Sequence, residues 1–246
     1  MLELQNITYS ASDENGEKDI LRDVSLTLED NKFYVITGPN GSGKSSLAKI
    51  IAGLYTPEAG KIIFNGRDIT NLSITERANL GISFAFQQPI RFKGITVKDL
   101  IKLAANGPAD KDMNADVCDY LSQVGLCARD YINREVNASL SGGELKRIEI
   151  AMTLARKSQF TVFDEPEAGI DLWSFNNLIK VFEKLHDETH GSIVIISHQE
   201  RIINIADEII LLADGEIVRS GSKDEIMPLL MSGNIAKPGC SKAAAV

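Results

Sequence analysis

Eight consecutive residues carry the strongest chemical signal in this chain. They are Gly38, Pro39, Asn40, Gly41, Ser42, Gly43, Lys44 and Ser45, which fit the phosphate-binding pattern G-x-x-x-x-G-K-[ST] at every fixed position. Glycines let successive backbone N–H groups point at an anion, and the start of a following helix adds partial positive charge. We expect Lys44 to reach nucleotide phosphates and the Ser45 hydroxyl to suit Mg²⁺. A plain glycine turn is the alternative, but the strand-like run before the pattern and the helix-like run after it favour a phosphate site.

Two adjacent carboxylates end a second apolar run. Residues 160–163 read Phe-Thr-Val-Phe, and Asp164 and Glu165 follow directly. A buried strand rarely ends in two acids unless a positive group lies nearby. Asp164 is placed to bind Mg²⁺, directly or through water, and Glu165 is placed to polarise an attacking water as a general base. The alternative is a strand that simply runs into solvent.

An imidazole follows a third apolar run. His198 comes directly after residues 192–197, which read Ser-Ile-Val-Ile-Ile-Ser. A lone histidine is more often structural, but ligands of open parallel sheets gather at the carboxyl ends of the strands. The glycine-rich segment, the two acids and His198 all follow predicted strands. We therefore expect three segments to converge on one crevice.

Two other segments each leave two interpretations open. Gln87 lies in Phe-Gln-Gln-Pro, where its amide would orient a water or touch Mg²⁺, or would belong to an ordinary turn. Ser141, Gly142 and Gly143 precede an amphipathic run. They are either a second phosphate-binding helix start or an ordinary cap with Ser141 as the N-cap residue.

The hydrophobic periodicity predicts an α/β protein around these residues. From Leu2 the chain alternates apolar and polar residues on both sides of an acidic turn at 12–18, which indicates antiparallel strands with one face in solvent. Helical periodicity over 96–130, broken at 106–108, predicts an inserted helical hairpin, and the small residues after Ser232 are expected to fray. Short strands are predicted at 33–37, 60–65, 160–163, 192–197 and 208–213, and helices at 44–54, 142–156, 174–189 and from Gln199.

The composition bounds the setting. The 246 residues are 43% apolar and 24% charged, as in ordinary globular proteins, and the net charge of −8 disfavours a chain that mainly grips nucleic acid. No apolar run approaches the ~20 residues of a membrane-spanning helix, and the first residues do not resemble a secretion signal. Three cysteines without ligand spacing indicate reduced thiols and no cluster bound by this chain. We expect a cytoplasmic protein.

Together these motifs resemble those of the ATP-binding cassette (ABC) ATPases over essentially the whole chain. Residues 38–46 resemble the Walker A segment, with Ser46 as its last residue, and Gln87 resembles the Q-loop glutamine. Leu-Ser-Gly-Gly-Glu at 140–144 matches the family signature, 161–166 the Walker B segment and His198 the switch histidine. The family order of the five motifs is preserved.

The resemblance implies a fold, a reaction and a dimer. The fold is a P-loop NTPase of the ABC type, with a RecA-like, mostly parallel sheet, an antiparallel β subdomain and an inserted helical subdomain. It implies ATP and Mg²⁺, with Ser45, Gln87 and Asp164 around the metal and with Glu165, His198 and Gln87 in catalysis. It also implies a head-to-tail homodimer, in which Ser141, Gly142 and Gly143 of one chain close over the ATP held by the other.

The resemblance also divides the chain. Residues 1–88 and 136–232 are expected to form the nucleotide-binding core with its N-terminal β subdomain. Residues 89–135 are expected to form the helical subdomain, and 233–246 a C-terminal tail. An adenine-stacking tyrosine often precedes the core strand in this family, but this chain has Ala11 there and Tyr9 nearby.

Other departures indicate a narrower group. The segment after the signature reads Leu-Lys-Arg-Ile-Glu-Ile (145–150), Glu167 follows the Walker B acids, and 81–89 with Gly94 is distinctive. These features resemble SufC, the ABC ATPase of the SUF iron–sulfur assembly system, which implies a soluble SufB/SufD-like scaffold as partner. The alternative partner is the transmembrane subunit of a transporter, and direct nucleic-acid binding is not expected.

Overall fold

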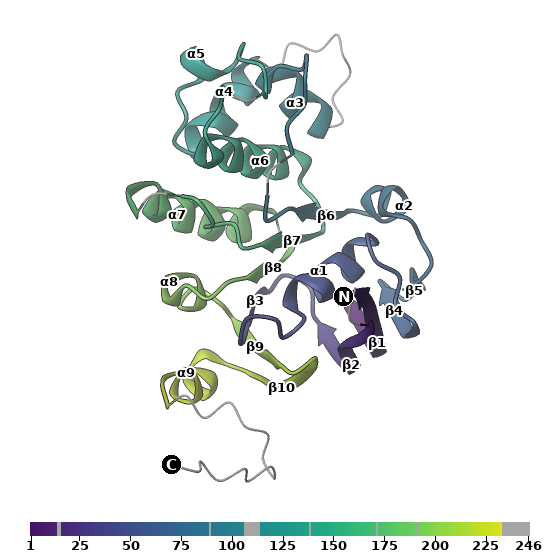
Figure 1. Ribbon diagram of the computed structural model, residues 1–246. Helices are drawn as coiled ribbons and strands as arrows, with labels where there is room; N and C mark the ends of the chain where they lie inside the picture. Colours follow the sequence, from purple (N-terminus) through teal and green to yellow (C-terminus); the bar gives the residue numbers. More distant parts are fainter. Residues whose placement is uncertain are drawn as a thin grey trace.

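The computed structural model describes residues 1–13, 16–88, 90–105, 114–137, 139–170, 172–189 and 191–232. Two sheets and a set of surrounding helices make up this part of the chain (Figure 1). The strands are β1 (Leu2–Asp13), β2 (Gly16–Leu28), β3 (Phe33–Thr37), β4 (Ala59–Phe64), β5 (Arg67–Asp68), β6 (Ile82–Ala85), β7 (Phe160–Asp164), β8 (Ser192–Ile196), β9 (Glu208–Ala213) and β10 (Glu216–Gly221). The helices are α1 (Lys44–Ala52), α2 (Ile74–Asn79), α3 (Val97–Ala104), α4 (Asn114–Gln123), α5 (Ala128–Tyr131), α6 (Gly142–Arg156), α7 (Leu172–Thr189), α8 (Glu200–Ile203) and α9 (Lys223–Ser232).

The larger sheet forms the centre of the molecule. Its strand order is β10-β9-β3-β8-β7-β6, and all neighbours are parallel except β10, which pairs antiparallel with β9. The buried strands β3, β7 and β8 are apolar on both faces, as expected for a parallel sheet that is covered on both sides. In β3, Phe33 and Val35 join the core under α6 and α7, whereas Tyr34 and Ile36 join the core under α1.

The smaller sheet is antiparallel, in the order β2-β1-β4-β5. Its inner residues share one hydrophobic core with α1 and one face of the larger sheet, so α1 lies between the two sheets (Figure 1). On the other face of the larger sheet, α7 lies beside α6, and α8 and α9 follow towards the C-terminal end. Beyond α6, at the top of Figure 1, α3, α4 and α5 form the helical part predicted over 96–130.

Most predicted elements are confirmed, with differences at their ends. The β1–β2 hairpin is tighter than the predicted turn at 12–18, because strand pairing continues through Ser12 and Glu17. The helix predicted over 44–54 ends at Ala52, because Gly53 takes the left-handed conformation that caps it. Strand β8 ends before Ser197, and Gln199 is the N-cap of α8 rather than its first residue. The predicted break at 106–108 and the predicted fraying after Ser232 lie outside the described residues.

Several elements were not predicted from the sequence. Helix α2 begins with a capping box, in which the side chains of Ser73 and Glu76 each accept a hydrogen bond from the other residue's backbone N–H. Strand β10 returns along β9 through a two-residue turn in which Asp214 and Gly215 both have positive φ, as a type I′ hairpin requires. Helix α9, which follows β10, and the short strands β5 and β6 complete the set.

Candidate nucleotide site

The glycine-rich loop between β3 and α1 has a shape that side chains would block. Gly38 has φ +141°, and a Cβ there would lie 1.9 Å from the carbonyl oxygen of Leu212. Gly43, with φ +100°, is the N-cap of α1, and a Cβ there would lie 2.7 Å from the Leu21 side chain. The loop is therefore held close to β9 and β2, with its backbone free to curve around an anion at the helix start. Ser45 and Ser46 follow in the first turn of α1.

Lys44 lies folded over this loop. Its Nζ donates hydrogen bonds to the carbonyl oxygens of Gly38 and Pro39, both at 2.8 Å, and the residue is 5% exposed. Burial lowers the pKa of Lys44, and the nearby carboxylates of Glu165 and Asp164 oppose that shift. A phosphate is the type of ligand that would favour the charged form of such a lysine.

The donors present suit a triphosphate with a hard divalent cation. Within the described residues, the Oγ of Ser42 is buried at the loop without a hydrogen-bond partner. Ser45 Oγ donates to Asp164 Oδ1 at 3.0 Å, so a hydroxyl and a carboxylate from two distant segments already meet. Oxygen donors of this kind are those that Mg²⁺ prefers. Burial raises the pKa of Asp164, the hydrogen bond from Ser45 opposes that shift, and a bound cation would favour the ionised form.

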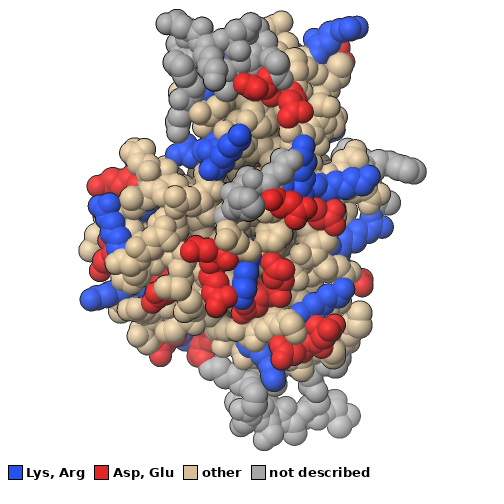
Figure 2. Space-filling view, turned by 180° about the vertical axis from the view of Figure 1, so that it is seen from behind, with Lys and Arg blue, Asp and Glu red and all other residues tan. Residues whose placement is uncertain are grey.

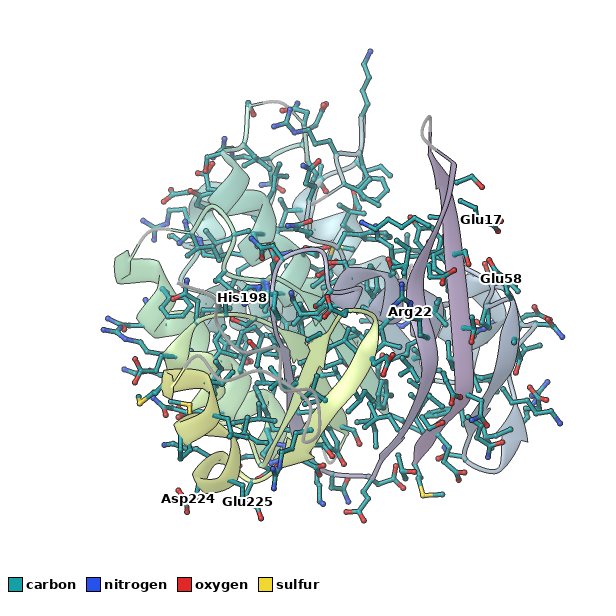
Figure 3. The ribbon with its side chains drawn as sticks, turned by 60° about the horizontal axis from the view of Figure 1, so that its bottom comes forward. Glu17, Arg22, Glu58, His198, Asp224 and Glu225 are labelled. Carbon is teal, nitrogen blue, oxygen red and sulfur yellow. The ribbon has the colours of Figure 1, made fainter. Side chains whose placement is uncertain are left out.

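Three strand ends bring the predicted residues together. Asp164 of β7 is level with Ile196 of β8, which is level with Ile36 of β3, so the segments that follow these strands share one edge of the sheet. The three segments therefore end at the same edge of the sheet, as the sequence predicted. A cavity of about 700 Å³ lies there. Residues 37–40, His198, Ile203 and side chains of α9 line it, whereas Asp164 and Glu165 are not among its lining residues. Figure 3 shows His198 near the middle of the molecule, well away from the hairpin end that Glu17 marks.

Glu165 and Gln87 are in direct contact. The Gln87 Nε2 donates to Glu165 Oε2 at 2.6 Å, although the two residues are 78 positions apart. Glu165 has a positive φ of 45°, and its backbone N–H donates to the carbonyl of Ile196 at 3.0 Å, which fixes it beside β8. Positive φ is uncommon at a non-glycine residue and costs free energy, so the surrounding contacts must hold Glu165 in this conformation.

The pKa of His198 is lowered. Burial is the main cause, the charge of Lys44 adds to it, and Glu165 opposes it. The imidazole is therefore neutral at pH 7, with one nitrogen able to donate a hydrogen bond and the other able to accept one. The neighbouring Ser197 Oγ accepts the backbone N–H of Gln199 at 3.0 Å and donates to the Glu167 carboxylate.

The signature segment is not gathered into this crevice within the chain. Ser141 caps α6 in a capping box, with its Oγ accepting the Glu144 N–H at 3.2 Å and its own N–H donating to the Glu144 carboxylate at 2.6 Å. Gly142 faces open space, and a Cβ on Gly143 would lie 3.3 Å from the Gly169 carbonyl. The capping interpretation is correct for the single chain, and the glycine pair leaves this helix start accessible.

The structure shows contacts of three residues, Lys146, Glu149 and Glu167, to which the sequence alone assigned no position in the site. Lys146 is fully buried, and its Nζ lies 3.1 Å from Glu149 Oε2. Glu167 is largely buried beside Ser197, and burial raises its pKa. All three lie at positions where the sequence departs from common transporter cassettes, and that departure is the sequence feature that could have pointed to them. Tyr9, considered for base stacking, instead stacks on Tyr55, with ring centroids 5.2 Å apart.

An apolar groove of about 330 Å³ runs between the core and the helical part. Phe84 lines it from β6, Phe86 and Ile90 line it from the segment after β6, and Leu103 lines it from α3. Leu103 is 71% exposed and Ile90 50% exposed, which is unusual for large apolar side chains. In the described part of the chain, every helix is too short or too polar to cross a membrane.

Comparison with known proteins agrees with this geometry. The family model described as "ABC transporter" matches residues 21–168. This chain is 40% identical over 232 residues to the uncharacterized ABC transporter ATP-binding protein MJ0035 of Methanocaldococcus jannaschii, covering 92% of this chain and 90% of that protein. The chain therefore belongs to the ABC family of ATPases, with ATP as substrate and Mg²⁺ as cofactor.

The chain is also similar to two further relatives and to a solved structure. The chain is 33% identical to the probable ATP-dependent transporter ycf16 of Antithamnion, over 87% of this chain and 90% of the relative. It is 34% identical to the sulfate/thiosulfate import ATP-binding protein CysA of Synechocystis, over 89% of this chain and 61% of CysA. Among solved structures, the dimeric ATP-binding cassette MJ0796 bound to ADP and Pi matches with a TM-score of 0.80 and 25% identity. That match covers 91% of this chain and 99% of that chain. The expected ABC cassette fold is thus confirmed.

Proposed function

We propose that this chain is the ATP-hydrolysing subunit of an ABC machine, which dimerises on ATP and drives a conformational cycle in a partner protein. The observation that carries the proposal is the meeting of Ser45, Asp164, Glu165 and Gln87 beside the glycine-rich loop. The expected division into a core (1–88 with 136–232) and a helical subdomain (89–135) belongs to the same proposal.

The site residues would divide the chemistry as follows. The backbone N–H groups of residues 38–46 and the Lys44 ammonium bind the phosphates. Ser45, Asp164 and Gln87 would hold Mg²⁺, which neutralises charge on the phosphate oxygens when bound. Glu165 orients the attacking water and accepts its proton, and His198 donates a hydrogen bond to the γ-phosphate.

The second copy completes the site. A single chain presents Ser141, Gly142 and Gly143 at a helix start that does not face its own glycine-rich loop, and a helix start with small residues suits phosphate binding. We infer that these residues close over the ATP held by a twin chain in a head-to-tail pair. The cassette MJ0796, which this chain resembles, is a dimer.

The exposed apolar groove is the surface to which we assign the partner. Its apolar lining and its exposed Leu103 and Ile90 suit an amphipathic helix that lies between the core and the helical part. The names of MJ0035, ycf16 and CysA favour the transmembrane subunit of a transporter as the protein that supplies that helix. Acidic and basic side chains are interleaved on the face in Figure 2, and the net charge is −8, so nothing favours a nucleic-acid partner.

A soluble SUF-type scaffold is the second candidate partner. The observation that favours it is the set of departures around α6 and β7, since Lys146, Glu149 and Glu167 occupy positions where this chain resembles SufC. In that case ATP hydrolysis would drive SufB/SufD-like proteins during iron–sulfur assembly.

One pull-down separates these candidates. A tagged Glu165→Gln variant should bind Mg-ATP, form a stable dimer and retain its partner, because the water is no longer deprotonated. The matched control is Lys44→Ala, which should not bind ATP productively. A partner recovered without detergent and identified as β-rich supports the scaffold, and a polytopic protein recovered from membranes supports the transporter. A Glu165→Gln chain that hydrolyses ATP at the normal rate would remove the proposed base.

A further inference from the structure

Two buried charged residues of α6 hold the backbone next to Gln87. The Lys146 Nζ donates a hydrogen bond to the carbonyl oxygen of Phe86, and Glu149 Oε1 accepts the Phe86 N–H at 2.8 Å. The N–H and the carbonyl of Phe86 are thus both bound by this pair of side chains, which lies 60 or more positions away in the sequence. Gln87, the next residue, places its amide on Glu165.

Lys146 and Glu149 are too little exposed to be an ordinary surface ion pair. The Lys146 side chain is 0% exposed, the Glu149 side chain is 16% exposed, and the two charges lie 3.1 Å apart. Burying an ion pair is costly unless its members make further hydrogen bonds, and here those bonds go to Phe86. Apolar side chains at these positions would avoid the cost of burying charge but would leave the Phe86 N–H and carbonyl without these partners. The pair therefore acts on this one backbone unit.

We propose that Lys146 and Glu149 are positioning residues: they fix the Phe86 backbone and thereby hold the Gln87 amide against Glu165. The inference rests on the proposed role of Gln87 at the reacting centre. Neither residue touches ATP. Their effect on hydrolysis passes through one backbone unit.

Glu149, one member of this pair, lies at the wall of the apolar groove. Phe86, Leu145, Ile148 and Glu149 all line it, and the Phe86 ring packs edge-on against Phe84 at 4.9 Å. A segment bound in the groove would contact these side chains and Glu149 directly. Movement there would shift Phe86 and, with it, the contact between Gln87 and Glu165.

The test is a double-mutant cycle on steady-state ATP hydrolysis. Glu149→Ala should lower kcat by roughly ten- to a hundredfold, because small misplacements at a reacting centre are expensive, while ATP binding changes less than about threefold. In a Gln87→Ala background, adding Glu149→Ala should change kcat less than about twofold, since the residue acts through Gln87. Glu149→Gln keeps an acceptor for the Phe86 N–H and should retain more activity than Glu149→Ala. Glu183→Ala, at an exposed position of α7, is the control for removing a carboxylate.

Amide hydrogen exchange supplies a second measurement if residual rates are too low to compare. The peptide covering residues 82–88 should exchange faster in Glu149→Ala and unchanged in Glu183→Ala, with thermal unfolding confirming that both fold. Equal effects of Glu149→Ala with and without Gln87, or unchanged exchange at 82–88, would overturn the positioning role. A Gln87→Ala chain with normal kcat would instead refute the proposed role of Gln87, so the two failures are distinguishable.

Discussion

Glu167 is a carboxylate held in the folded chain at a cost that depends on pH. Burial raises its pKa, the hydrogen bond from Ser197 opposes that shift, and the Glu165 charge adds to it. A carboxylate whose pKa is raised on folding contributes stability that is present below its ordinary pKa of 4.5 and is lost as pH rises through the folded pKa. At neutral pH, Glu167 therefore lowers the free energy of unfolding.

Glu167→Gln should consequently stabilise the protein at pH 7 to 8. The amide keeps an oxygen to accept the Ser197 hydroxyl but carries no charge to desolvate. We expect a gain on the order of 1 kcal/mol, which for a chain of this size raises Tm by roughly 2–4 °C. The gain should vanish near pH 4, where the wild-type carboxyl is protonated in both states. Thermal unfolding of both proteins across this pH range measures it, and a gain independent of pH would contradict the electrostatic explanation.

At the scale of elements, the helix that follows the glycine-rich loop depends on one distant arginine. Arg77 of α2 is 1% exposed, and its guanidinium donates to the carbonyls of Ile50 and Ile51 at 2.6 and 2.9 Å, at the end of α1. It also donates to the carbonyls of Leu72 and Thr70. Burial lowers the pKa of Arg77 to about 10, so the side chain stays charged at neutral pH. One side chain thus caps α1 and ties it to α2.

Arg77→Met keeps much of the buried volume but removes every one of these donors. We expect the free energy of unfolding to fall by about 3 kcal/mol, because each buried carbonyl left without a partner costs roughly 1–3 kcal/mol. Arg67→Met, at an exposed position of β5, should change it by less than about 0.5 kcal/mol. Urea denaturation followed by circular dichroism compares the two, and equal effects would show that Arg77 does not cap α1.

The elements also show which features the sequence could predict. Strands such as β3 and β7 are continuous apolar runs that end in chemical motifs, so their place and the crevice at their ends followed from pattern alone. The α2 capping box and the Asp214–Gly215 turn left readable signals that the prediction missed. Contacts such as Gln87 with Glu165, or Lys146 with Phe86, join residues 60 or more positions apart. They depend on side-chain packing that no local pattern encodes.

At the scale of the whole molecule, the two parts of the proposed nucleotide site do not meet within one chain. The glycine-rich loop and the carboxylates of Asp164 and Glu165 lie at the carboxyl edge of the sheet. Helix α6 begins with a glycine pair, and Gly142 faces open space. A head-to-tail pair with two-fold symmetry would unite each part with its complement and make two equivalent sites. A single chain should therefore hydrolyse ATP slowly, and the rate per chain should rise with protein concentration.

Complementation between two inactive variants tests this arrangement directly. Gly142→Asp should fold normally, because nothing lies within 4 Å of the new Cβ and an acid is favourable in the first turn of a helix, but its carboxylate would repel the twin's phosphate. Glu165→Gln should bind ATP without hydrolysing it. In an equal mixture, half of the dimers combine the variants and one of their two sites is intact, so about a quarter of wild-type activity should return. Activity no higher than the sum of the separate variants would show that each chain works with its own signature segment.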